Sequence, residues 1–112
     1  MKTEDHVAQF RKAAIDKGDF AEPTQDQALH AAMSEAFQAL QHSDEGRNAF
    51  EVLLADESLH VRTWVAAQLL FLGRTEKARA ILEDVASGRG LVAMNARVTL
   101  SEYDAGRLGS PL

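Results

Sequence analysis

Cysteine is absent from all 112 residues of the sequence. This absence excludes disulfide bonds, a thiolate nucleophile and a zinc site with thiolate ligands. Only two prolines interrupt the chain, and no apolar run approaches the roughly 20 residues that a membrane-spanning helix requires. We therefore expect no membrane partner, and the polar N-terminal segment MKTEDHVAQF favours a cytoplasmic location.

Positive charge is missing from one long segment of the sequence. No lysine or arginine lies between Gly18 and Gly46. The carboxylates of this segment are Asp19, Glu22, Asp26, Glu35, Asp44 and Glu45. Without these six, 11 acids remain against all 12 bases, so the segment accounts for the net charge of -5. It is either a solvated face that keeps the protein soluble or a surface that attracts a protein partner with basic side chains.

A net negative charge opposes a broad role in nucleic-acid binding, because phosphate contacts require clustered lysine and arginine. The C-terminal half does carry positive charge, at Arg74, Lys77, Arg79, Arg89 and Arg97. These residues have no aromatic side chains interleaved among them. A nucleic-acid-associated protein is therefore the minor alternative.

Apolar residues recur at helical spacing along most of the chain, and the sequence has few clusters of β-branched residues. This pattern predicts helices over about 3–17, 24–41, 44–55, 59–73, 75–86 and 91–104. The expected capping residues are Thr3, Thr24, Ser43 and Thr75. We expect an all-α fold, a compact bundle or superhelix of five or six antiparallel helices forming one domain over 1–108, with a loose tail at 109–112.

The segment LLADESLHVRTWVAAQLLFLG, residues 53–73, is apolar on nearly every side of its helical part. A helix that is hydrophobic all round is a buried helix. We therefore expect the helix containing Trp64 to be central, with Trp64 as a core anchor or, alternatively, as a contact for a partner.

The same segment resembles one unit of the HEAT repeat family. The resemblance rests on Leu53-Leu54-Ala55-Asp56, Val61-Arg62, Ala66-Ala67, Leu70 and Gly73. It implies a helical hairpin over 44–73, in which Asp56 and Arg62 stabilise the turn. No second copy follows at a similar period, so we do not expect a long solenoid.

The C-terminal half resembles a small bacterial family with a HEAT-like, armadillo-type helical fold, known as domain of unknown function two-thousand-nineteen. The matching positions are Trp64-Val65-Ala66-Ala67, Leu82-Glu83, Gly88, Gly90, Ala96, Thr99-Leu100, Glu102, Gly106 and Leu108. Tyr103 stands where the family pattern has tryptophan, which keeps an aromatic anchor at that position. The resemblance implies protein binding, and in this respect the chain is similar to small bacterial immunity proteins.

No arrangement of residues predicts catalysis, a metal site or a cofactor. The four histidines, His6, His30, His42 and His60, are dispersed and form no metal-binding pair. His42-Ser43-Asp44 has the residue types of a hydrolytic triad, but consecutive side chains diverge, and capping by Ser43 explains it better. Gly88-Arg89-Gly90 lacks the preceding strand of a phosphate-binding loop. The sequence therefore favours a protein that is not an enzyme.

The last predicted helix has two apolar faces. Ala93, Ala96, Leu100 and Tyr103 share one face, while Leu91, Met94 and Val98 share another. The second face either packs against flanking helices of the same chain or forms a homodimer.

These observations favour a non-enzymatic protein-binding module with an immunity-like or regulatory role, and Asp26, Glu35, Asp44 and Glu45 are the candidate contacts. The alternative is a structural or oligomer-forming helical protein whose acidic segment has no partner.

Overall fold

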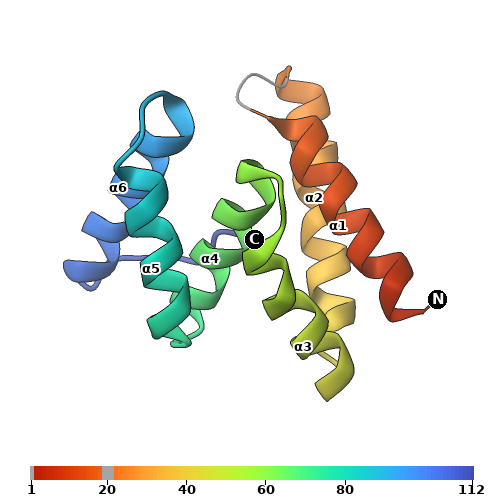
Figure 1. The fold of residues 1–112 in the computed structure, drawn as a ribbon. Helices are drawn as coiled ribbons and strands as arrows, with labels where there is room; N and C mark the ends of the chain where they lie inside the picture. The colour runs from red at the N-terminus through yellow and green to blue at the C-terminus, as the bar shows by residue number, and fades with distance from the viewer. Residues whose placement is uncertain (1, 19–21) are drawn as a thin grey trace. The chain divides into compact units, whose positions relative to one another are not determined.

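The computed structural model describes residues 2–18 and 22–112, and all regular elements within these ranges are helices. They are α1 (Thr3–Lys17), α2 (Pro23–Leu40), α3 (Asp44–Val52), the short 3-10 helix η1 (Leu53–Ala55), α4 (Leu59–Phe71), α5 (Thr75–Ala86) and α6 (Leu91–Asp104). Figure 1 shows their order along the chain. The all-α prediction is therefore confirmed.

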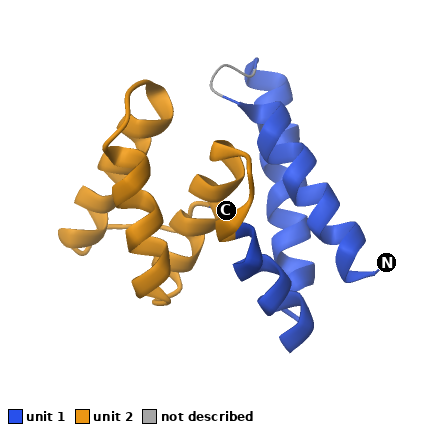
Figure 2. Cartoon of the chain, viewed as in Figure 1, with its two compact units in different colours: residues 1–53, 112 blue, residues 54–111 orange. Residues whose placement is uncertain are grey.

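The helices form two compact units, coloured separately in Figure 2. Unit 1 comprises residues 1–53 together with Leu112, and unit 2 comprises residues 54–111. The two helices of the expected HEAT-like hairpin thus belong to different units, α3 to unit 1 and α4 to unit 2. The hairpin and the single domain over 1–108 stay predictions.

Unit 1 is built on the antiparallel pair α1 and α2, and α3 packs against both (Figure 1). Phe50 of α3 is at the centre of its core. The Phe50 ring meets Phe10 of α1 edge-on at 5.2 Å between centroids and lies 5.1 Å from Phe37 of α2. The buried alanines Ala14 and Ala36 leave room for the helices to approach closely.

Unit 2 consists of α4, α5 and α6, each of which contacts the other two. Residues 65–70 of α4 are all buried, including the polar Gln68. Six consecutive residues cover more than one full helical turn, so this part of α4 exposes no face to solvent. The continuous apolar run in the sequence correctly predicted that burial.

One of the four predicted capping residues is confirmed. Ser43 caps α3, because its Oγ accepts the Gly46 N–H at 2.9 Å. The other three predictions were wrong by a residue or two. Thr3 and Thr75 are the first residues of their helices rather than caps, and α2 begins at Pro23 with Glu22 before it.

The sequence predicts that Gly18, Gly73 and Gly106 end their helices, and each of these glycines follows a helix in the structure. Gly18, Gly73 and Gly106 follow the last turns of α1, α4 and α6 with positive φ angles of 47°, 87° and 73°. L-residues with a side chain rarely adopt this backbone conformation. After Gly18 the sequence predicts a loop over 19–23, and residues 19–21 of that loop lie outside the described residues.

The C-terminal tail contacts α4. The Ser110 hydroxyl donates a hydrogen bond to Gln68 Oε1 at 3.5 Å, and Pro111 is partly buried. The looseness expected for residues 109–112 stays a prediction.

Candidate functional site

Two of the four candidate contact residues already have ionic partners within the chain. Asp26, in the first turn of α2, forms an ion pair with Lys17 at the end of α1, and the Lys17 side chain is only 10% exposed. Asp44 pairs with Arg47 one turn later in α3, although the Asp44 side chain remains 91% exposed. Asp26 therefore links α1 to α2 through its ion pair, whereas the Asp44 side chain still faces solvent.

The other two candidates, Glu35 and Glu45, are exposed. No other residue of 2–18 and 22–112 forms an ion pair with either of them. The structure does not bring all four candidates together, because they are spread along α2 and into α3. Asp26 lies near the start of α2, and the end of that helix at Leu40 is already roughly 21 Å away along the axis, at 1.5 Å per residue. Only Asp44 and Glu45 are adjacent.

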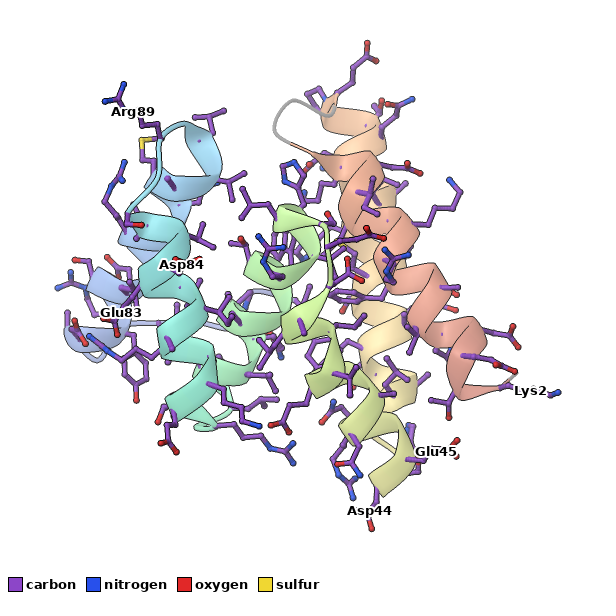
Figure 3. All side chains as sticks on the ribbon, in the orientation of Figure 1. Lys2, Asp44, Glu45, Glu83, Asp84 and Arg89 are labelled. Atoms are coloured by element: carbon purple, nitrogen blue, oxygen red, sulfur yellow. The ribbon has the colours of Figure 1, made fainter. Side chains whose placement is uncertain are left out.

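The fold places Glu45 beside the same depression as Glu4, a residue outside the acidic segment of the sequence. Both glutamates line a shallow depression in unit 1, and each lies in the first turn of its helix, α3 or α1. The depression is lined by Lys2, Thr3, Glu4, Val7, Glu45 and Ala49. Figure 3 shows Asp44, Glu45 and Lys2 near one end of this unit. We call Glu4, Asp5, Asp44 and Glu45 the acidic end.

One local signal could have identified the acidic end. Acidic residues are favoured in the first turn of a helix by its dipole, and Glu4 and Asp5 are such residues. Asp5 accepts the Lys2 backbone N–H at 3.1 Å. The proximity of Glu4 to Glu45 depends on the packing of α1 against α3, which no local signal encodes.

Net charge divides at the boundary of the two units. Residues 1–53 contain ten of the 17 acids and five of the 12 bases, so they carry the entire formal charge of -5. Residues 54–111 contain seven acids and seven bases and are neutral. The acidic segment between Gly18 and Gly46 lies within unit 1, and the rest of unit 1 has four acids and five bases.

The turn before α4 is held by the two residues that the HEAT resemblance singled out. Arg62 Nη1 donates to the carbonyl oxygens of Asp56 at 2.7 Å and Glu57 at 3.2 Å. The Asp56 carboxylate accepts the Ser58 N–H at 3.0 Å, and Ser58 caps α4. Trp64, two residues after Arg62 in α4, is partly buried.

Tyr103 belongs to an ionic cluster that joins α5 to α6. Arg79 of α5 donates two hydrogen bonds to the Asp104 carboxylate, at 2.9 and 3.2 Å, and an ion pair of 3.2 Å joins it to Glu83. Its guanidinium carbon also lies 5.9 Å from the centroid of the Tyr103 ring. Arg79, one of the positive charges of the C-terminal half, thus connects two helices.

The same cluster changes the pKa of its members. The hydrogen bond from Arg79 holds the pKa of the Asp104 carboxyl below its ordinary value, and the hydrogen bond to Asp104 raises the pKa of Arg79. A carboxyl with a lowered pKa in the folded state stabilises the fold above its unfolded pKa. This contribution is lost as the pH falls through the folded pKa.

We expect an NMR titration of the side-chain carboxyl carbons to find the pKa of Asp104 below its ordinary value, and Arg79→Gln to raise it. Asp104→Asn should lower the free energy of unfolding at neutral pH but have little effect at a pH below the folded pKa of Asp104. A pKa that Arg79→Gln leaves unchanged would show that the ion pair does not form in solution.

The two faces predicted for α6 are both present. Ala93 and Ala96 are buried, and Leu100 and Tyr103 are partly buried. On the other face, Met94 is 46% exposed and Val98 is 54% exposed, and Leu91 is partly buried. Flanking helices of the chain therefore leave Met94 and Val98 largely in solvent.

Within residues 2–18 and 22–112, no three histidine or acidic side chains are grouped closely enough to hold a metal ion. None of the helices in these ranges has the length and apolar character needed to cross a bilayer.

Comparison with known proteins leaves the family open. The sequence matches no family model, and neither a curated protein nor a solved structure is significantly similar to it.

Proposed function

We propose that the chain is a non-enzymatic binding module whose acidic unit 1 attracts a protein partner with basic side chains. The observation that carries this proposal is the division of charge, because unit 1 has all of the net charge of -5 while unit 2 is neutral. A field concentrated on one module steers a basic partner toward that module.

Within unit 1, the acidic end offers the most suitable contact. Glu4 and Glu45 stand beside a depression whose lining includes the apolar side chains of Val7 and Ala49. A lysine or arginine of the partner would lay its aliphatic stem over these apolar side chains and direct its charged group to the carboxylates. Lys2 also lines the depression and would move aside or compete for the carboxylates.

This mode of binding suits a regulatory or immunity-like role in a bacterium, in which a small protein covers a basic surface on a larger one. In the alternative, the acidic residues only keep a structural protein soluble. Exposed surface ion pairs contribute little individually, about 0–1 kcal/mol. Binding through unit 1 therefore requires several carboxylates acting together.

The test uses a fluorescent peptide of alternating lysine and alanine as a probe, with binding followed by anisotropy at low and physiological salt. We expect the double variant Glu4→Lys/Glu45→Lys to weaken binding by on the order of tenfold, which corresponds to about 1.4 kcal/mol. Added salt should weaken binding to the unchanged protein, because exposed charges are screened.

The matched control is Glu76→Lys/Asp84→Lys, which makes the same change in net charge on exposed residues of unit 2. This control should retain most of the affinity. An equal loss in both double variants would mean that only the total charge matters, and the proposed binding surface would be rejected.

A further inference from the structure

The exposed face of α6 carries a heptad pattern. Leu91, Met94, Val98 and Ser101 of α6, with Ala105 directly after the helix, follow one another at alternating spacings of three and four residues. This is the spacing of the two core positions, called a and d, through which helices pair in a coiled coil. We call these five residues the α6 stripe.

The α6 stripe lies opposite the side of the helix that packs within unit 2. Ala93 and Ala96, which are buried, occupy heptad positions c and f when Leu91 is assigned to position a. Met94, Val98, Ser101 and Ala105 are exposed, and Leu91 is partly buried. Unit 2 thus uses one side of α6 for its own core and presents the other side to solvent.

Charged residues beside the stripe complement a second copy of the same helix. Arg97 occupies position g of one heptad, and Glu102, five residues later, occupies position e of the next. In a parallel two-helix coiled coil, position g of one helix lies beside position e of the following heptad in its partner. A parallel pair of α6 helices would therefore form the Arg97–Glu102 contact twice, once on each side.

We infer that two copies of this chain associate through parallel pairing of their α6 stripes. Leu91, Met94 and Val98 of one copy contact the same residues of the other. The antiparallel arrangement is less favourable. In it, Met94 of each copy lies opposite Val98 of the other, and the two Arg97 side chains then lie on the same side of the pair at nearly the same height. Like charges at that separation repel one another.

The bonds within each chain leave these charged groups able to pair. Arg97 Nη1 donates to the Ala86 carbonyl oxygen at 2.7 Å, while an arginine has five N–H groups in total. The Glu102 carboxylate accepts from Arg107 at 3.2 and 3.4 Å, and its oxygens have further lone pairs.

The small size of the stripe predicts a weak dimer. α6 has 14 residues and is therefore roughly 21 Å long. Only three residues of the stripe, Leu91, Met94 and Val98, have large apolar side chains. Stable interfaces usually bury about 1,200 Å² or more in total, and smaller ones are transient. The dimer is thus expected only at high protein concentration, and it does not depend on the proposed partner of unit 1.

Cysteine cross-linking can test both the dimer and its direction, because the natural chain has no cysteine. In a parallel pair, Val98→Cys lies opposite itself at a separation that suits a disulfide. We expect Val98→Cys to form covalent dimers several-fold faster than Val52→Cys under mild oxidation. Val52 is the matched control, since it is 71% exposed and lies in unit 1.

The direction is tested by oxidising an equimolar mixture of Met94→Cys and Val98→Cys and identifying the products by mass spectrometry. Parallel pairing predicts mainly the two homodimers, whereas a predominance of the mixed dimer would overturn the parallel direction. Equal rates for Val98→Cys and Val52→Cys would overturn the dimer itself.

The dimer should also disappear when charge is placed on the stripe. Met94→Glu brings two carboxylates together, so light scattering at high concentration should show a monomer, while Val52→Glu should leave the mass unchanged. A dimer mass retained in Met94→Glu would contradict pairing through α6. Far-UV circular dichroism checks that each variant is folded.

Discussion

Gly46→Ala should destabilise unit 1 by roughly 3 kcal/mol, the upper part of the usual range for overpacking a well-packed site. A Cβ atom at position 46 would lie 2.2 Å from the carbonyl oxygen of Leu40 and 2.9 Å from its carbonyl carbon. Both atoms belong to the backbone at the end of α2. They cannot move aside as a flexible side chain would, so α3 must shift away from α2.

Two further contacts make such a shift costly. The Gly46 N–H donates to Ser43 Oγ at 2.9 Å, and Arg47 Nη1 donates to the Gln41 carbonyl oxygen at 2.8 Å. Both bonds hold the first turn of α3 against the turn that follows α2. A displaced α3 would stretch them while it also moved Phe50 in the core.

Urea denaturation followed by far-UV circular dichroism measures the effect of Gly46→Ala. Hydrogen exchange of amides in α1, α2 and α3 would show whether the loss is confined to unit 1. Gly109→Ala is the control, because nothing lies within 4 Å of a Cβ atom there, and it should change the free energy of unfolding by less than about 0.5 kcal/mol. Equal stability of both variants would show that the close approach at Gly46 does not exist in solution.

The sequence predicted the helices well because their apolar residues recur at helical spacing and glycines stop several of them. Two of the errors at helix starts have a common cause: Thr3 and Thr75 suit a capping position but are also tolerated in the first turn. At α2, Pro23 occupies the first helical position, where its missing N–H has no cost. The proline therefore moved the start of α2 ahead of the expected Thr24 cap.

The candidate surface was harder to predict because its residues are distant in sequence. Glu4 and Glu45 line one depression although 41 positions separate them, and Arg79 reaches Asp104 across 25 positions. Each contact depends on how two helices pack, which local spacing does not specify. The division between Leu53 and Leu54 also lacks a sequence signal, since the chain there continues from α3 into η1 without glycine or proline.

Phe50→Ala should cost about 3–5 kcal/mol, the usual range for removing a buried phenylalanine. Phe50 is fully buried, and its ring contacts Phe10 and Phe37, so it joins all three helices of unit 1. The substitution would remove the apolar contacts of the ring and leave a cavity that the surrounding helices fill only in part. It would also remove both aromatic pairs, each worth roughly 0.5–1.5 kcal/mol beyond its buried area.

Such a loss is a large share of the 5–15 kcal/mol that typically stabilises a whole domain. Thermal unfolding followed by circular dichroism should therefore show a much lower midpoint for Phe50→Ala, with an intermediate value for Phe50→Leu, which keeps most of the apolar volume. Val52→Ala, two residues away on the same helix but 71% exposed, should leave the midpoint almost unchanged. If Phe50→Ala and Val52→Ala unfolded at the same temperature, the ring of Phe50 could not be the centre of the core of unit 1.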